Sequence, residues 1–480
     1  MTGVMMTAAL AAGIVLSPKG DADMTADVMD AVDRVRTAGG GEIRLTAGTY
    51  HFRSPQAMRF YVSNHDNPLP RNVFLPVTNV TDSSFRQKVA RRSSSMARVW
   101  GLRSLTRGIR ACAAWDSTTR GPPSAKSLSR KSKPLAPGDF ATLRSPVRPN
   151  PTVLMYRADE TVLENCAVHA ADGMGIVAQR SANVTVRGTG RPEGRLAGSF
   201  ARAGTRRRLS LQADATHSSN CRGRVTVENC LFEGMNGDAI NVHSTCLCIG
   251  RVDSPTLILC EYRHSQSIGF EVFLPGERLR FIRAKTMEPV ERVTKVVAAE
   301  MQDARHVLLE LADPLPEEIA VGDAVENADC QPSVVFRGNV VRNPSPRATL
   351  FTTPGKVVCE SNVFEHVSAQ AVLLSADAWN WYESGACRDV TIRGNVFRDV
   401  CILGGRGVIQ IGPNVKDLSA QKARYHRNIR VEGNVFEQAK GPLLYARSVS
   451  NLVWRANDVS KVPAEARTYD VQFCEAVEIK

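Results

Sequence analysis

A short pattern that recurs along the chain limits its possible folds more than any other feature. The pattern reads apolar-x-apolar-x-x-Asn-x-apolar. Alternation of apolar and other residues is typical of a half-buried β-strand, and a fixed residue after each strand indicates a stack of similar units. We place the asparagine of this pattern at Asn165, Asn229, Asn339, Asn362, Asn395, Asn434 and Asn457.

The spacing of the asparagines indicates the length of one unit. Asn339 and Asn362 are 23 residues apart, as are Asn434 and Asn457, and the intervals on either side of Asn395 are 33 and 39 residues. The short interval matches one turn of a right-handed parallel β-helix, and a longer one is a turn with an inserted loop. We therefore predict an all-β fold, a right-handed parallel β-helix, in which stacked coils bury one core and the asparagines form a ladder. A β-sandwich is the alternative, but it does not predict asparagine at one place in every unit.

The remaining segments are predicted to cap or interrupt the coils. Residues 23–37 are predicted to form a short N-terminal capping helix that ends at Gly39–Gly41. Residues 260–326 have the pattern of antiparallel strands joined by short turns, and so of a small β-rich insertion. The chain then divides into an N-terminal cap with the first coils (1–82), a basic Ser/Arg-rich segment (83–150), coils with an aspartate pair (151–259), the insertion (260–326) and the C-terminal coils (327–480).

The net charge of +13 is concentrated in one of these segments. Between Arg86 and Lys133 there are thirteen lysines and arginines against one acid, Asp116. Such a composition buries too little apolar surface to offset chain entropy, so we expect residues 83–150 to be irregular and poorly packed. A nucleic-acid-binding arm and a reading-frame error are the alternatives for this segment. The rest of the chain is nearly neutral, which predicts no nucleic-acid partner for the fold itself.

Cysteine usage and hydropathy argue against several other classes of protein. The closest of the twelve cysteines are Cys246 and Cys248, and no CxxC pair occurs, which argues against a zinc ribbon or a redox motif. We expect packed thiols, no metal and no cofactor. The apolar N-terminus lacks a basic region, so no signal peptide is indicated, although export stays open if the N-terminus is incomplete. No segment approaches the roughly 18 consecutive apolar residues of a membrane span.

Two aspartates are spaced to act together on such a scaffold. Asp214 precedes Asp238 by 24 residues, which is about one coil. Neighbouring parallel strands lie about 4.8 Å apart, so residues one coil apart in sequence become neighbours in space. Two carboxylates in this arrangement can share an attacking water, and hydrolysis of a glycosidic bond normally needs two positioned carboxyl groups. The structural alternative is a pair of aspartates that cap turns.

Several motifs of the chain resemble those of glycoside hydrolase family 110. They are QADATH, EGMNGDAINVH, YRHSQSIGF, TLFTTP, WYESGACRDV, FYVSNHDNP and LLYARSV, and the resemblance covers roughly residues 18–80 and 151–475. Members of that family are inverting exo-α-1,3-galactosidases on a parallel β-helix, which remove terminal galactose from blood-group-B-type glycans. The resemblance implies this fold and activity for the chain, with a galactose-terminated glycan as its partner.

The resemblance also implies catalytic roles. The family carries one aspartate in QADATH and two before AINVH, whereas this chain has Asp214 and Asp238 but Gly237 at the first place of the doublet. By analogy with pectin-cleaving β-helix enzymes, the outer pair holds the water and the first aspartate of the doublet donates the proton. Asp214 and Asp238 are therefore the expected catalytic residues, and the missing donor at Gly237 implies impaired hydrolysis. The alternative is that another group, Asp238 itself or Glu383, acts as the acid.

Other residues of the matching motifs are expected to line the galactose site, each with a purely structural role as its alternative. Trp379 or Trp381 is expected to stack on the sugar or to pack, in a loop with Asp377 that resembles the family only loosely. A non-catalytic β-helix that binds galactose-terminated glycans is the alternative function. A polygalacturonase-like enzyme is disfavoured, since no basic cluster suited to uronates accompanies the aspartates. The expected substrate-binding residues are His217, Asn241, His243, His264, Gln266, Arg347 and Glu383.

Overall fold

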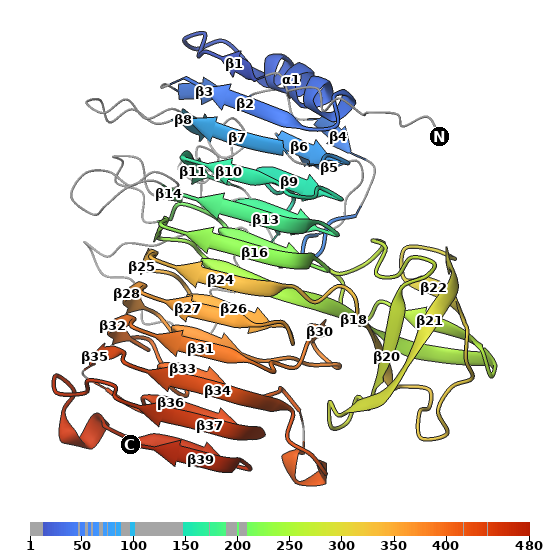
Figure 1. The fold of residues 1–480 in the computed structure, drawn as a ribbon, viewed down its shortest axis with the longest axis vertical. Coiled ribbons are helices and arrows are strands. Elements are labelled where there is room, and N and C mark those ends of the chain that lie inside the picture. Colours follow the sequence, from blue (N-terminus) through green and yellow to red (C-terminus); the bar gives the residue numbers. More distant parts are fainter. Residues whose placement is uncertain are drawn as a thin grey trace, which may run out of the picture.

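The computed structural model shows a tall stack of β-coils with a smaller antiparallel unit at its side (Figure 1). Chain order follows the stack, so the N-terminal cap and the last strands lie at opposite ends (Figure 1). The structure describes residues 13–46, 49–52, 56–58, 61–66, 71–73, 75–81, 83–87, 97–100, 147–171, 173–188, 199–200, 209–415, 417–438 and 440–480.

The N-terminal end of the stack is covered by the helix α1 (Thr25–Thr37), which connects β1 (Ile14–Leu16) to β2 (Gly41–Leu45). A carboxylate oxygen of Asp23 accepts the N–H of Thr25 (3.0 Å), which helps to begin the helix. The predicted capping helix is confirmed. Its apolar residues that face the first coils are Val28, Ala31, Val32 and Val35.

Parallel sheets run the length of the stack, and each full coil contributes a short strand to each of them. The first sheet contains, in spatial order, β1, β2, β7 (Ser83–Gln87), β10 (Val162–Glu164), β13 (Ala182–Arg187), β16 (Arg222–Glu228), β24 (Ser333–Arg337), β27 (Val357–Glu360), β31 (Val390–Arg393), β34 (His426–Glu432), β37 (Val449–Arg455) and β39 (Glu475–Ile479). The second contains β3 (Thr49–His51), β8 (Ala97–Trp100), β11 (Cys166–Ala170), β14 (Ser199–Phe200), β17 (Leu231–Glu233), β25 (Val340–Arg342), β28 (Val363–Val367), β32 (Val396–Val400) and β35 (Val435–Glu437). The third contains β6 (Leu75–Thr78), β9 (Val153–Tyr156), β12 (Ile176–Gln179), β15 (Thr216–Ser219), β18 (Ile240–Ser254), β26 (Thr349–Thr352), β29 (Val372–Leu374), β33 (Ile409–Ile411), β36 (Leu444–Arg447) and β38 (Tyr469–Gln472).

The predicted right-handed parallel β-helix is therefore confirmed. Of the basic segment 83–150, the structure describes β7, β8 and residues 147–150, and both strands pair within the sheets. The other residues of that segment, and with them most of the expectation of poor packing, lie outside the described residues. Within the described part of the chain, no helix is long and apolar enough to cross a membrane.

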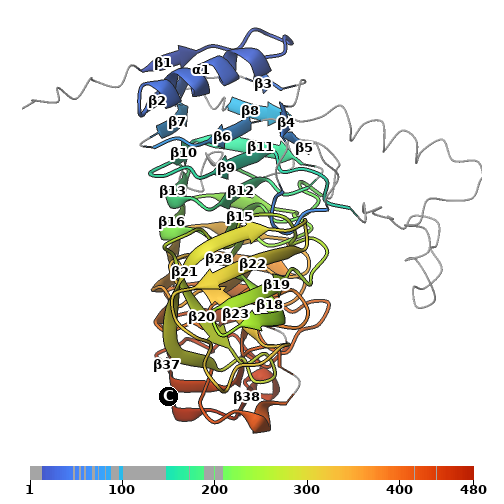
Figure 2. The same ribbon diagram turned by 90° about the vertical axis from the view of Figure 1, so that its right-hand side faces the viewer.

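The second half of β18 leaves the stack and enters the antiparallel unit, which faces the viewer in Figure 2. The unit has its own apolar core, which includes Leu279, Phe281 and Leu309. The division of the chain into five segments stays a prediction. The further strands of the unit are β19 (Leu257–Glu261), β20 (Arg278–Ile282), β21 (Pro289–Met301), β22 (His306–Leu311) and β23 (Ala324–Asn327). The remaining short elements are β4 (Gln56–Met58), β5 (Arg71–Val73), β30 (Glu383–Ser384) and the 3₁₀ turns Leu418–Ala420 and Ala464–Ala466.

A buried carboxylate joins the antiparallel unit to the coils. Glu277 accepts hydrogen bonds from Arg180 Nη2 (2.6 Å), from Asn327 Nδ2 (2.6 Å) and from the N–H of Leu274 (2.9 Å), and Arg222 also contacts it. Arg180 directly follows β12 of the third sheet, whereas Glu277 belongs to the antiparallel unit. Because a buried charge is costly unless its oxygens are satisfied, this contact favours one placement of the unit against the stack.

The predicted asparagine ladder is present in the C-terminal coils. The Oδ1 atom of Asn395 accepts both the backbone N–H and the Nδ2 group of Asn362, at 2.9 Å each. The Nδ2 group of Asn395 donates to Cys359 O and to Asn434 Oδ1, again at 2.9 Å. The same geometry links Asn339 to Asn362 and Asn434 to Asn457. The ladder therefore satisfies buried backbone groups at each bend while it ties neighbouring coils together.

The prediction that all seven asparagines occupy one place in the coil is wrong for Asn165 and Asn229. The register places Glu228 beside Arg337 and Leu231 beside Val340, so that Asn229 stands opposite Gly338. Asn165 and Asn229 have φ angles of 58° and 55°, and they occupy the left-handed bend position that Gly338 fills in a later coil. Asparagine tolerates that conformation better than most residues do.

We expect Asn395→Ala to lower the free energy of unfolding by about 2–4 kcal/mol, because it removes the acceptor of the buried backbone N–H of Asn362 and of one side-chain N–H of that residue, and it removes a hydrogen bond to Cys359 O. Chemical denaturation measures this change. The control is Asn380→Ala at an exposed turn position, which should change stability by less than about 0.5 kcal/mol. Equal effects of the two substitutions would show that the ladder adds no stability.

Candidate active site

The two aspartates predicted from their spacing occupy equivalent positions on neighbouring coils. Asp214 lies just before β15 and Asp238 just before β18, and these strands pair in parallel with His217 beside Asn241. The backbone N–H of Asp238 donates to Asp214 Oδ1 (3.0 Å), and the N–H of Ala215 donates to Asp238 O (2.8 Å). The side chains of both aspartates are buried. Their alignment follows from the coil length of 24 residues between them.

Gly237 lies where two neighbouring coils approach each other closely. A Cβ atom on Gly237 would stand 2.4 Å from the carbonyl carbon of Ala213, 2.4 Å from Asp214 Oδ1 and 2.5 Å from the backbone nitrogen of Asp214. Its φ angle is not in the left-handed region. The glycine is therefore required by close approach rather than by backbone conformation, and the coil as built has no space for an aspartate at this position.

Two buried histidines continue from Asp214 along the outer face of the third sheet. His217 Nδ1 lies 2.9 Å from Asp214 Oδ2, and His217 Nε2 lies 3.0 Å from His243 Nε2. His243 Nδ1 lies 3.0 Å from the carbonyl oxygen of Ser244. Strand alternation explains this row, because Ile240 and Val242 point into the core and their neighbours point outward.

Glu383 and Arg347 bring further charge to the same place. Glu383 lies on β30 beside β18, accepts a hydrogen bond from Asn64 Nδ2 (2.8 Å) and lies 3.7 Å from His243 Nε2. Arg347 Nε lies 2.9 Å and 3.0 Å from the two carboxylate oxygens of Asp238. The structure thus joins Asp214, Asp238, His217, His243, Arg347 and Glu383 into one cluster.

The environment moves the pKa values of the three carboxyl groups apart. Burial acts to raise the pKa of Asp214, but the hydrogen bond and charge of His217 outweigh it and hold that pKa well below its usual range. Burial, assisted by the negative charge of Asp214, raises the pKa of Asp238 to about 7 against the lowering charge of Arg347. The pKa of Glu383 is lowered, because the charges of His243 and Arg347 outweigh its burial.

The antiparallel unit supplies two of the predicted residues from the loop that follows β19. The ring of His264 packs against that of Trp381, with centroids 4.2 Å apart and ring planes at 31°, and burial lowers the pKa of His264. Gln266 Nε2 donates to Asp66 Oδ1 (3.0 Å). The charge of Glu383 acts to raise the pKa of His264 against the effect of burial, so His264 and its neighbours border the carboxylate cluster.

The loop that contains Asp377, Trp379 and Trp381 has two parts. Asp377 and Trp379 have structural roles, and Trp381 borders the site. Asp377 Oδ1 accepts the N–H groups of Trp379, Asn380 and Tyr382, so it caps the turn. Trp379 Nε1 donates to Asn414 O (2.6 Å), which points this side chain at another loop. Trp381 is the tryptophan beside the site.

Sequence reasoning missed Asn64, Asp66 and Arg148 as site residues. Asn64 and Asp66 lie in the motif FYVSNHDNP, which contributed to the family resemblance but gave no sign of proximity to Glu383. Arg148 lies in the segment expected to be irregular, yet its guanidinium stands 5.8 Å from the ring centre of Trp381 and its charge lowers the pKa of Asp214. Contacts across such distances in sequence leave no local pattern.

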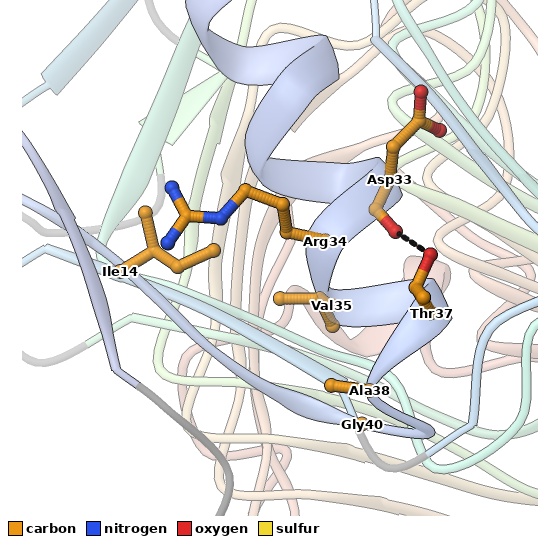
Figure 3. A pocket seen from close by; sticks show the side chains of 7 residues that line it. All are labelled: Ile14, Asp33, Arg34, Val35, Thr37, Ala38 and Gly40. Carbon is orange, nitrogen blue, oxygen red and sulfur yellow. Dashed lines mark hydrogen bonds between the residues drawn. The ribbon is translucent and has the colours of Figure 1, made fainter.

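A hollow in the surface lies apart from the predicted site residues. A hollow beside α1, shown in Figure 3, contains none of the predicted site residues and is lined by Ile14, Asp33, Arg34, Val35, Thr37, Ala38 and Gly40. Among the described residues, no group of three or more His, Cys, Asp and Glu side chains is arranged to hold a metal ion.

The chain is similar to several known proteins. Residues 257–325, which form most of the antiparallel unit, match the family described as GLAA-B beta-barrel domain II. Alpha-1,3-galactosidase B of Akkermansia muciniphila is 36% identical over 511 residues, covering 89% of this chain and 63% of that protein. Alpha-1,3-galactosidase B of Bacteroides fragilis (strain YCH46) is 39% identical over 354 residues, covering 70% and 58%. The chain is homologous to proteins named alpha-1,3-galactosidase.

This homology confirms the resemblance drawn from the sequence motifs. The chain spans 63% and 58% of the lengths of these two relatives, so it corresponds to about three fifths of each. Among solved structures, the A-module of a mannuronan C-5 epimerase from Azotobacter vinelandii is 10% identical, covers 96% of both chains and has a TM-score of 0.40. An exopolygalacturonase from Thermotoga maritima is 11% identical, covers 97% of this chain and 91% of that one, and has a TM-score of 0.38. Likenesses of this strength say nothing about the site.

We expect Gly237→Ala to lower the free energy of unfolding by about 1–3 kcal/mol, because its Cβ would overlap the backbone of Ala213 and Asp214. Gly237→Asp carries the same Cβ and should lose at least as much. Thermal and chemical denaturation measure both effects, with Gly13→Ala as control, since a Cβ there meets only a carboxylate oxygen of Glu42 at 3.9 Å. A Gly237→Ala protein as stable as the parent would show that the coils separate easily here.

Proposed function

We propose that the chain is an inverting glycoside hydrolase that removes terminal α-1,3-linked galactose from glycans of the blood-group-B type. The observation that carries this proposal is the buried pair Asp214 and Asp238, aligned on neighbouring coils with oppositely shifted pKa values. The names of the homologues support galactose as the sugar. Because the chain spans only part of those relatives, the substrate and the activity are both part of the proposal.

Asp214 is suited to the role of general base. His217 hydrogen-bonds one of its oxygens, and the pKa of Asp214 is lowered, so the group is a carboxylate throughout the working pH range. In an inverting mechanism the base removes a proton from water that attacks the anomeric carbon from the face opposite the leaving group. A group that stays ionised is always ready to accept that proton.

Asp238 is the carboxyl group best suited to donate a proton. Among the three carboxyl groups of the cluster, only that of Asp238 has a raised pKa. Two neighbouring carboxyl groups whose environments separate their pKa values are the usual basis of an acid and base pair. In the resembling family the donor stands at the place of Gly237, so we propose that Asp238 takes this role here.

Groups at the edge of the cluster are proposed to hold the sugar. In the part of the chain that the structure describes, Oδ1 of buried Asn241 has no hydrogen-bond partner, so it is free to accept from a sugar hydroxyl. Trp381 offers an aromatic surface for the apolar face of galactose. We also propose that residues 260–326 act as a domain that places His264 and Gln266 at the rim of the site.

The proton-donor role is tested with Asp238→Asn on two substrates. Hydrolysis of Galα1-3Gal should fall about 10²- to 10⁴-fold, because its sugar leaving group needs a proton. An aryl α-galactoside has a leaving group that needs none, so its hydrolysis should fall far less. Asp214→Asn should abolish both activities, whereas Asp253→Asn, at the distant exposed end of β18, should change neither.

Two other outcomes would contradict parts of this proposal. If Asp238→Asn lowers both activities equally, Asp238 is not the proton donor but holds the water together with Asp214. The position of the family's proton donor is then occupied by Gly237, which has no acidic group. In that case Gly237→Asp, but not Gly237→Ala, should raise hydrolysis of the disaccharide. If the parent protein binds the disaccharide and hydrolyses neither substrate, the chain is a glycan-binding protein instead.

The pH dependence of kcat on the disaccharide should follow the raised pKa of Asp238. An acid with a raised pKa keeps its proton below that pKa and loses it as the pH rises through it, so kcat should decline above about pH 7. The aryl galactoside should show a weaker decline. A kcat for the disaccharide that stays constant from pH 6 to pH 9 would exclude Asp238 as the proton donor.

A further inference from the structure

Two buried imidazole rings face each other nitrogen to nitrogen in this cluster. His217 Nε2 and His243 Nε2 lie 3.0 Å apart, with ring planes at 74°. Both side chains are 0% exposed, so water does not screen the contact. At this distance, two nitrogens that both carried lone pairs, or both carried protons, would repel each other. One proton must therefore lie between them.

The contacts of the two Nδ1 atoms show where the remaining protons of the rings lie. His243 Nδ1 contacts the carbonyl oxygen of Ser244, which can only accept, so this nitrogen carries a proton. His217 Nδ1 contacts Asp214 Oδ2 at 2.9 Å, so one proton lies in that hydrogen bond as well. The chain Asp214–His217–His243 thus contains three protons in three hydrogen bonds. With Asp214 ionised, the two rings together carry one positive charge.

We propose that His217 and His243 form an imidazole–imidazolium pair with one shared proton, which holds Asp214 in its ionised and correctly oriented form. The existence of the shared proton follows from the hydrogen bonds alone. Its role in positioning the base rests on the function proposed above. His217 and His243 are positioning residues in this account, since they act on the reaction through Asp214.

The charges around the pair explain why a proton is retained at a buried site. Asp214 stands at the His217 end, and a carboxylate oxygen of Glu383 lies 3.7 Å from His243 Nε2, beside the contact between the two rings. Two carboxylates therefore lie next to a single positive charge. Arg148 acts on Asp214, Arg347 pairs with Asp238, and neither contacts the two rings by hydrogen bond in the described structure. Burial outweighs the charge of Glu383 and lowers the pKa of His243.

A third buried histidine supplies a matched control within the same chain. His426 is 0% exposed, and its Nδ1 accepts the N–H of Cys387 at 3.2 Å. That nitrogen therefore carries a lone pair, and the ring is neutral with its proton on Nε2. Burial and the charge of Arg388 lower the pKa of His426 to about 3. Its signals should show an ordinary neutral ring at every pH at which the protein is folded.

Nuclear magnetic resonance of the full chain labelled with ¹⁵N-histidine tests the shared proton without any activity. We expect a scalar coupling between the Nε2 nuclei of His217 and His243 across their hydrogen bond, and a strongly deshielded proton between them, from pH 5 to pH 8. Both features should vanish in His217→Gln and in His243→Gln but persist in His426→Gln. Lone-pair ¹⁵N shifts at both Nε2 atoms of the parent protein would overturn the shared proton.

A pH–rate profile tests the positioning role separately. His217→Gln removes the positive charge beside Asp214, so the pKa of Asp214 should rise and the acidic limb of kcat/KM should move up by more than one pH unit. His426→Gln should leave that limb in place. An unchanged limb in His217→Gln would overturn the positioning role even if the coupling is present. A coupling observed in a protein that hydrolyses no galactoside would overturn the proposed function while the shared proton stands.

Discussion

The structure depends on one constraint, which is the fixed register between neighbouring parallel coils. Backbone hydrogen bonds in each sheet place a residue beside its counterpart one coil away, as His217 stands beside Asn241 and Asn241 beside Leu350. The buried asparagine ladder reinforces this register at the bends. A slip of one residue would turn every side chain of a strand to the other face. The alignment of Asp214 with Asp238 is thus a consequence of the same bonds that hold the stack together.

The carboxylate cluster requires compensation because it is buried. Three carboxyl groups with little exposure would repel one another, and each is costly to remove from water. The chain meets this cost with Arg347 beside Asp238, with His217 beside Asp214 and with Asn64 beside Glu383. Unequal compensation is also what separates their pKa values, so the arrangement that stabilises the cluster is the one that suits acid and base chemistry.

Gly237 shows how closely packed coils limit the chemistry of a site. Its backbone approaches Ala213 and Asp214 so closely that a side chain would displace one coil from the other. An enzyme of this fold with a carboxyl group at that place needs a different local path of the chain. The glycine therefore affects both which carboxyl group can donate a proton and how tightly Asp238 is held against Asp214.

The sequence alone was sufficient to predict the parallel β-helix, the capping helix and the neighbouring positions of Asp214 and Asp238, because each depends on a local period or on one coil length. The same reasoning misplaced Asn165 and Asn229 by one residue, since alternation does not distinguish the inward asparagine from the left-handed bend beside it. Only the tertiary structure revealed the contact of Asn64 with Glu383, which are 319 residues apart, and that of Arg347 with Asp238, which are 109 apart. It also decided that His217 meets His243 and that no side chain fits at Gly237. These features depend on where loops from distant coils return to the stack, and the spacing of residues along the sequence does not indicate those positions.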